Sequence, residues 1–158
     1  MLTNAKWIKS PIDMATAAVE FRRSFSIKNK VKSAILYISS AGIYSPKLNG
    51  KKITDAVLMP GITSYKTRIL YQEYDVTEFI SESNELSFGV GPGWAVGHYG
   101  YSREKQLYFD EIALILRILI LRERPAALLV VGATGHRFCF DQMATNEFAH
   151  FEFPPYNQ

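Results

Sequence analysis

The dipeptide Asn49-Gly50 is the feature that most constrains what this chain can fold into. It stands between two extended runs, and both of its residues tolerate the positive φ that a tight type I′ turn requires. It therefore predicts a hairpin. We expect the chain to turn at Asn49-Gly50, cross a loop at Pro60-Gly61 and return as a second long strand over residues 68–76.

Further short apolar runs with period two flank this hairpin. Residues 31–39 are apolar on both faces, which is typical of a strand covered on both sides. Leu86, Phe88 and Val90 share one face of another strand. Other candidate strands are residues 5–8, 21–27, 108–121, 126–131, 138–140 and 148–153, and Asp75 is placed to cap a single helical turn at 77–80. Roughly eight or nine short strands, with turn signals about every ten residues, predict an all-β sandwich or barrel.

Length and composition exclude several classes of protein. A chain of 158 residues that is 47% hydrophobic is the size of one folded domain. Its net charge of +3 is evenly spread, so we expect no nucleic-acid partner. The apolar run 112–121 is too short to span a bilayer, so we expect no membrane partner. Residues 1–21 lack the apolar core of a signal peptide, which leaves the compartment open between cytoplasm, periplasm and extracellular space.

No motif for catalysis, metal or cofactor binding stands out. Cys139 is the only cysteine, so neither a disulfide within the chain nor a cysteine zinc cluster can form. Gly91-x-Gly93 lacks the third glycine of a dinucleotide fingerprint. Paired carboxylates would suit glycoside hydrolysis, but spacing selects no pair among Asp55, Glu73, Glu104, Asp110 and Glu111, and His98, His136 and His150 stand far apart. We therefore predict no catalytic residue, no metal and no cofactor.

The segment 91–106 is the best candidate for ligand contact. It holds four of the ten glycines, and we expect a long surface loop that carries aromatic residues. Rings stack on the apolar faces of sugars while polar groups bond the hydroxyls. We therefore take Trp94, His98, Tyr99 and Tyr101 as carbohydrate-binding candidates. The alternative for Trp94 is that it tucks under the loop and covers one end of the sandwich.

Several motifs occur in an order that resembles one family, the N-terminal domain of bacterial α-L-rhamnosidases. They are Ala41-Gly42-Ile43-Tyr44, Leu48-Asn49-Gly50-Lys51, Pro60-Gly61-x-Thr63-x-Tyr65, Arg68-x-x-Tyr71-Gln72-x-Tyr74-Asp75-Val76-Thr77, Asn84-Glu85-Leu86 and Gly91-x-Gly93-Trp94. The resemblance covers about residues 5–116 and leaves 117–158 unassigned. It implies a single jelly-roll-like antiparallel β-sandwich of the galactose-binding-domain type. Within it, Tyr65, Tyr71 and Tyr74 should bury their rings.

The resemblance also implies a function for the parent protein. Such enzymes are glycoside hydrolases that remove terminal L-rhamnose, and their catalytic acid and base lie in a separate (α/α)6 barrel that this chain is too short to contain. The chain would then be a non-catalytic accessory domain that either assists recognition of a terminal L-rhamnoside or buttresses the catalytic barrel. Its partners would be a rhamnose-containing carbohydrate and the catalytic domain of the same protein. Two alternatives stay open: a self-sufficient lectin-like carbohydrate-binding module, and an independent enzyme.

Overall fold

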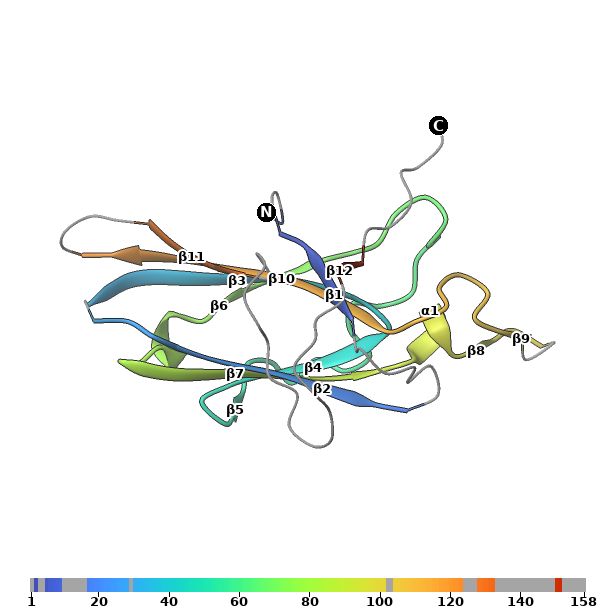
Figure 1. The fold of residues 1–158 in the computed structure, drawn as a ribbon, viewed down its shortest axis with the longest axis horizontal. Helices are drawn as coiled ribbons and strands as arrows, with labels where there is room; N and C mark the ends of the chain where they lie inside the picture. The colour runs from blue at the N-terminus through green and yellow to red at the C-terminus, as the bar shows by residue number, and fades with distance from the viewer. Residues whose placement is uncertain are drawn as a thin grey trace.

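Two antiparallel sheets lie face to face and form a β-sandwich (Figure 1). The computed structural model describes residues 2, 5–9, 17–28, 30–101, 104–123, 128–132 and 150–151. The two facing antiparallel sheets confirm the predicted all-β sandwich. His136, Cys139 and the candidate strand 138–140 lie outside the described residues.

The first sheet contains six of the described strands and the second contains four. The first runs in the order β12 (His150–Phe151), β1 (Trp7–Lys9), β10 (Ala113–Arg122), β3 (Val31–Ala41) and β6 (Gln72–Asp75), and β11 (Leu128–Gly132) also pairs with β10. The second runs β2 (Val19–Ser26), β7 (Ser83–Gly91), β4 (Ile43–Leu48) and β5 (Lys51–Lys52). A small hairpin of β8 (His98–Tyr99) and β9 (Glu104–Lys105), a 3₁₀ turn η1 (Thr77–Phe79) and a short helix α1 (Gly93–Val96) complete the described elements.

The core lies between the sheets and follows the period-two pattern of the sequence. Leu36 of β3 is in register with Ile118 of β10, and both side chains are fully buried. From the opposite sheet, Phe21 of β2 is in register with Phe88 of β7, again with no exposed surface. Each such side chain contributes about 1.5–3 kcal/mol when it leaves water. β3 is an interior strand of its sheet, between β10 and β6, and its other face carries the partly buried Ile35 and Tyr37.

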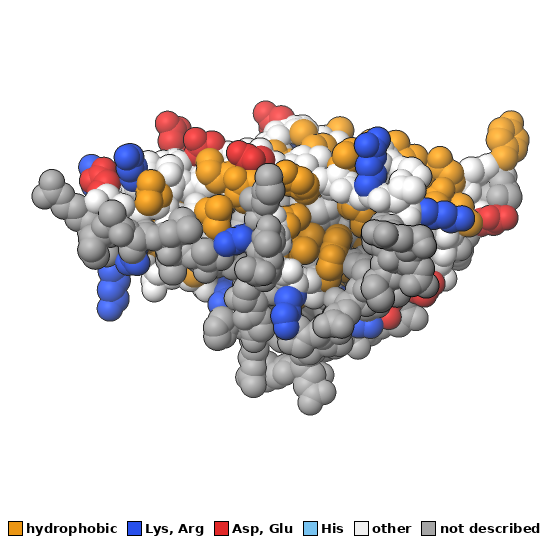
Figure 2. Space-filling view, turned by 90° about the horizontal axis from the view of Figure 1, so that it is seen from above, with side chains coloured by type: hydrophobic (Ala, Val, Ile, Leu, Met, Phe, Trp, Pro, Cys, Tyr) orange, Lys and Arg blue, Asp and Glu red, His pale blue; other side chains and the backbone are white. Residues whose placement is uncertain are grey.

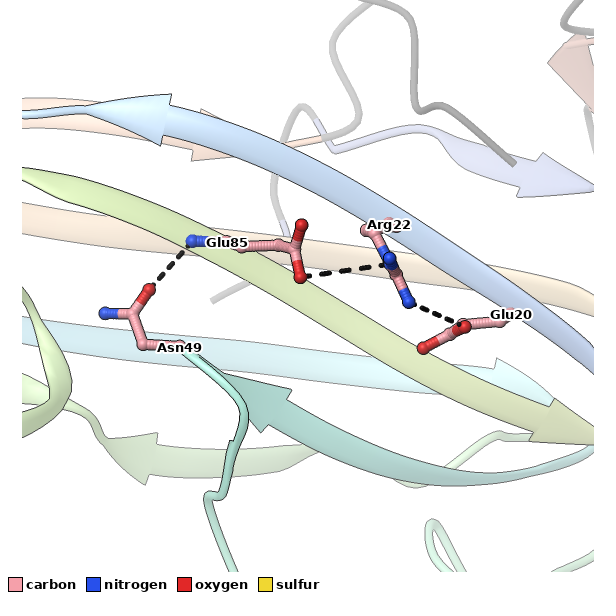
Figure 3. Close-up of polar contacts among 4 residues, drawn as sticks. All are labelled: Glu20, Arg22, Asn49 and Glu85. Atoms are coloured by element: carbon pink, nitrogen blue, oxygen red, sulfur yellow. Dashed lines mark hydrogen bonds and ion pairs between the residues drawn. The ribbon is translucent and has the colours of Figure 1, made fainter. Parts of the chain in front are cut away.

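The predicted turn at Asn49-Gly50 forms and joins β4 to β5. Asn49 has φ 54° and Gly50 has φ 75°, the left-handed values that a type I′ turn needs. The Asn49 amide nitrogen donates to the Phe79 carbonyl at 2.8 Å. The Asn49 amide oxygen accepts from the Glu85 N–H at 2.8 Å (Figure 3). The turn is thereby fastened to the start of β7.

The predicted return strand over residues 68–76 is wrong in its length. Only Gln72–Asp75 forms a strand, β6, and it pairs with β3 in the opposite sheet rather than with β4. Residues 53–71 instead cross from one sheet to the other. The Tyr44 N–H donates to the Met59 carbonyl at 2.8 Å near the start of this crossing, and the Ser39 hydroxyl donates to the Leu70 carbonyl at 2.6 Å near its end. β5 pairs with Lys47 and Leu48 of β4, Tyr44 forms an isolated bridge with Met59, and β6 pairs with β3.

The outer face of the second sheet carries a row of charges. The Arg22 guanidinium lies 3.1 Å from the Glu20 carboxylate and 3.9 Å from that of Glu85 (Figure 3). These partly exposed pairs contribute little to stability. They show that this face is solvated, in contrast to the apolar inner face.

The short turn η1 follows the sequence-based expectation. The Asp75 carboxylate accepts hydrogen bonds from the Thr77 N–H at 2.9 Å and from the Thr77 hydroxyl at 2.6 Å. These bonds hold the pKa of Asp75 below its ordinary value.

Within the described residues, no helix has the length and apolar character needed to cross a membrane.

Candidate functional site

The segment that follows β7 is more ordered than the sequence predicts. It contains α1 and the β8–β9 hairpin rather than an irregular loop. Gly93, at φ +53°, lets α1 approach β4, because a Cβ there would lie only 2.6 Å from Ile43 Cγ2. Gly42, just before β4, allows the close approach of the end of β7, since a Cβ on it would lie 2.3 Å from the Gly91 carbonyl oxygen. These glycines therefore serve close packing of the backbone rather than an open loop.

The hairpin is tied back onto the helix by its own backbone. The Gln106 N–H donates to the Val96 carbonyl at 3.1 Å, and the Phe109 N–H donates to the Ala95 carbonyl at 3.2 Å. Ala95 and Val96 are buried. The hairpin that carries Tyr99 is thereby held in one position at the end of the sandwich (Figure 1).

The four sequence-predicted residues divide into two inward and two outward side chains. Trp94 is partly buried and packs against the hydrophobic core, which agrees with the alternative prediction that it tucks under the loop. Tyr99 is half-buried, with its ring edge-on to Tyr108 at a centroid distance of 5.9 Å. His98 and Tyr101 are exposed. Neighbouring residues of a strand point to opposite faces, so His98 and Tyr99 of β8 face different sides.

An aromatic cluster that sequence reasoning missed lies beneath the hairpin. Tyr65, only 4% exposed, packs against Tyr108 at 5.1 Å and against Phe109 at 6.0 Å. Burial, and then the neighbouring phenols of Tyr108 and Tyr99, raises the pKa of Tyr65. The motif Pro60-Gly61-x-Thr63-x-Tyr65 marked this tyrosine, but nothing local could indicate which rings it meets. The cluster fastens the crossing segment 53–71 to the chain that enters β10.

A second buried network joins the two sheets below this cluster. The Tyr44 hydroxyl donates to Gln72 Oε1 at 2.8 Å, and Gln72 Nε2 donates to the Pro60 carbonyl at 3.0 Å. Burial, and then the hydrogen-bonded Tyr74 hydroxyl, raises the pKa of Tyr44 far above its ordinary value of 10.0. The expectation that Tyr71 buries its ring is wrong, because it is 46% exposed and its ring centroid lies 6.3 Å from that of Tyr37.

The acidic residues considered for catalysis lie at the surface. Glu111 pairs with Lys9 at 2.8 Å, and the other four carboxylates, Asp55, Glu73, Glu104 and Asp110, are exposed. No group of three or more His, Cys, Asp or Glu side chains in the described part of the chain could hold a metal ion. A cleft of about 370 Å³ is lined by Ile27, Lys28, Lys30, Val31, Thr77, Ile80, Ser81 and Glu82. None of the four candidate residues lines it.

Comparison with known proteins places this geometry in a family. The family described as alpha-L-rhamnosidase N-terminal domain matches residues 29–149. An α-L-rhamnosidase of Streptomyces avermitilis is 36% identical over 107 residues, which cover 66% of this chain and 10% of the relative. The chain therefore spans about a tenth of the length of this curated relative.

Solved structures agree with the sequence match. The crystal structure of an α-L-rhamnosidase from Aspergillus terreus superposes with a TM-score of 0.76 at 30% identity, over 82% of this chain and 16% of that chain. The Streptomyces avermitilis α-L-rhamnosidase complexed with L-rhamnose gives a TM-score of 0.71 at 30% identity, over 78% of this chain and 12% of that chain.

The fold and these matches place the chain in a class of protein domains, the antiparallel β-sandwiches that form one part of larger glycoside hydrolases. Within that class, the chain belongs to the α-L-rhamnosidase N-terminal domain family.

Proposed function

We propose that this chain is a non-catalytic accessory domain of an α-L-rhamnosidase and that it assists recognition of a rhamnose-containing carbohydrate. The observation that supports this most directly is the extent of the match, which covers 66% of this chain but only 10% of the Streptomyces avermitilis enzyme. A match of that extent corresponds to one supporting domain of the enzyme. The exposed positions of the candidate carboxylates agree with this role.

The α1–β9 segment is the proposed sugar-contacting surface. Tyr101 is fully exposed at the tip of the β8–β9 hairpin and offers a ring face for stacking, while the exposed His98 offers a nitrogen to a sugar hydroxyl. Tyr99 and Trp94 support the hairpin from inside through Tyr108 and the core. The packing of these inner rings holds the backbone that carries the outer pair, which lowers the entropic cost of binding.

Titration calorimetry with L-rhamnose and methyl α-L-rhamnoside tests this proposal. We expect heat of binding for the chain, loss of that heat in Tyr101→Ala and His98→Ala, and a weaker effect of Trp94→Ala. Tyr71→Ala is the matched control, because Tyr71 is also an exposed tyrosine but lies outside the α1–β9 segment. No heat with the unmodified chain, or equal heat in all four variants, would overturn the role in sugar recognition.

A further inference from the structure

The turn at Asn49-Gly50 places two reactive groups side by side. The backbone nitrogen of Gly50 can close a succinimide ring by attacking Cγ, the carbonyl carbon of the Asn49 side chain. Glycine hinders this attack least, because it has no side chain beside the attacking nitrogen. Asparagine is among the thermolabile residues of proteins, and Asn49-Gly50 is the only Asn-Gly pair in the sequence.

The turn is open to the water that this reaction consumes. Gly50 is exposed, Asn49 is half-buried, and a Cβ placed on Gly50 would meet no atom within 4 Å. The turn joins β4 to β5 at the edge of the second sheet (Figure 1). Seen from above, the side of the first sheet faces the viewer (Figure 2), and the turn lies on the opposite side of the molecule. Solvent access therefore does not protect Asn49.

The hydrogen bonds of the Asn49 side chain supply the protection instead. Its amide nitrogen, the group that must leave, donates to the Phe79 carbonyl at 2.8 Å and to Asn84 Oδ1 at 3.1 Å. Its amide oxygen accepts from the Glu85 N–H at 2.8 Å (Figure 3). These bonds hold the side chain toward η1 and β7, whereas attack requires the carbonyl carbon to face the Gly50 nitrogen at close range. The amide must first leave its three partners.

Conversion of Asn49 to an acid would prevent the turn from closing in the same way. An aspartate still accepts from the Glu85 N–H, but it has no N–H to donate to the Phe79 carbonyl or to Asn84 Oδ1. Asn84 does not offer its nitrogen in exchange, because that nitrogen donates to the Ser81 carbonyl at 2.7 Å and its oxygen accepts from the Ser81 N–H at 2.8 Å. Acceptor oxygens would then face one another without a proton between them, which is unfavourable.

We propose that Asn49 is a deamidation site gated by the fold, which reacts only when the turn opens locally and which then leaves the turn unfastened from β7. The Gly50 nitrogen bonds to Asn49 Cγ and gives up its proton. The bond from Cγ to the amide nitrogen breaks, and that nitrogen takes up a proton and leaves as ammonia. Water then opens the ring to give aspartate or isoaspartate, with no oxidation or reduction. This inference concerns the lifetime of the folded chain and is independent of the proposed function.

The hydrogen bonds also set the size of the protection. Each bond is worth about a factor of five in the equilibrium between the closed and the open turn. Two of the three are partly buried and one is solvent-exposed. Reaction from the open turn alone should therefore be about 30- to 100-fold slower in the folded chain than in the unfolded chain.

Mass-spectrometric peptide mapping of the chain 1–158 at mildly alkaline pH, with and without denaturing urea, tests the proposal. We expect Asn49 to deamidate about 30-fold or more slowly without urea than with it. Asn84 is the internal control, because Glu85 follows it in place of a glycine, and it should stay largely unmodified in both samples. Equal rates of Asn49 deamidation with and without urea would overturn the gating by the fold.

A pair of variants tests the gate in the folded chain. Asn84→Ala removes one acceptor of the Asn49 amide and leaves Asn49-Gly50 intact, so it should speed deamidation about five-fold. Ser45→Ala, at an exposed β4 position, should leave the rate unchanged. Circular dichroism shows whether each variant is folded, and an unfolded Asn84→Ala leaves the comparison in urea to decide. A folded Asn84→Ala that deamidates no faster than the unmodified chain would overturn the role of these bonds.

The variant Asn49→Asp tests the consequence of the reaction. It reproduces one product directly, and aspartate tolerates the φ of 54° at this position, so backbone strain does not obscure the result. We expect its melting temperature to be roughly 5–10 °C below that of the unmodified chain. An unchanged melting temperature would overturn the inference that deamidation unfastens the turn.

Discussion

Replacement of Asn49 by alanine should be among the most damaging single changes outside the hydrophobic core. The Asn49 side chain donates to the Phe79 carbonyl at 2.8 Å and to Asn84 Oδ1 at 3.1 Å, and it accepts from the Glu85 N–H at 2.8 Å. Three such bonds contribute about 1 kcal/mol each. An alanine at φ 54° adds about 1 kcal/mol of backbone strain. Since one of the three bonds is solvent-exposed, we expect Asn49→Ala to lower the free energy of unfolding by about 2–4 kcal/mol.

Urea unfolding followed by circular dichroism measures this loss, and an unchanged slope against urea would show that the unfolded state is unaltered. In a thermal scan the same loss should lower the melting temperature by roughly 5–15 °C. Asn49→Gly is the matched control. It relieves the left-handed backbone but lacks the three bonds, so it should cost roughly 1 kcal/mol less than the alanine variant.

Two results would refute this reasoning about Asn49. A loss below about 1 kcal/mol in Asn49→Ala would mean that the side-chain bonds do not fasten the turn to β7. A glycine variant as stable as the unmodified chain would mean that only the backbone conformation matters.

Three further predictions concern single positions. Gly93→Ala should cost about 1–3 kcal/mol in urea unfolding, since its Cβ would lie 2.6 Å from a β4 side chain, whereas Gly50→Ala has open space and should cost only about 1 kcal/mol. Tyr44→Phe should cost about 1 kcal/mol at neutral pH. Because the folded state raises the pKa of Tyr44, the stability contributed by its neutral hydroxyl is lost as pH rises above 10.0, and Tyr44→Phe should lessen that alkaline loss in pH-dependent melting. The Thr77 hydroxyl and N–H lower the pKa of Asp75 in the folded state. Its contribution to folding stability is therefore present above pH 3.8 and lost as the pH falls below that value, so Asp75→Asn should lessen the fall of the melting temperature at acid pH.

The parts of the fold that local pattern determines were predictable. Alternating apolar residues in β3 and β7 specify which side chains are buried, because side chains of a strand alternate between its faces. The turn at Asn49-Gly50 was predictable because only a few residue types tolerate its backbone angles.

The pairing of more distant segments could not be predicted in this way. Period two in residues 72–75 indicates a strand but does not say which sheet it joins, and β6 lies beside β3 rather than beside β4. The contact between Tyr65 and Tyr108 likewise depends on how the crossing segment lies on the sandwich. The four-residue helix α1 is too short to leave a periodic signal.

The candidate site was predictable in its residue types but not in its geometry. Glycine-rich sequence with aromatic residues indicated a surface loop, whereas Gly93 is there because a helix lies against Ile43. The side chains of Trp94 and His98 could not be assigned to the inside or the outside from sequence alone, since both outcomes fit the same local pattern.

Hydrolysis of an aryl α-L-rhamnoside, measured with the chain 1–158 and with the complete gene product, tests the central claim most directly. A non-catalytic accessory domain predicts turnover by the complete protein and none by the chain alone. Turnover by the chain alone that a single carboxylate substitution abolishes, such as Glu104→Gln, would contradict the claim.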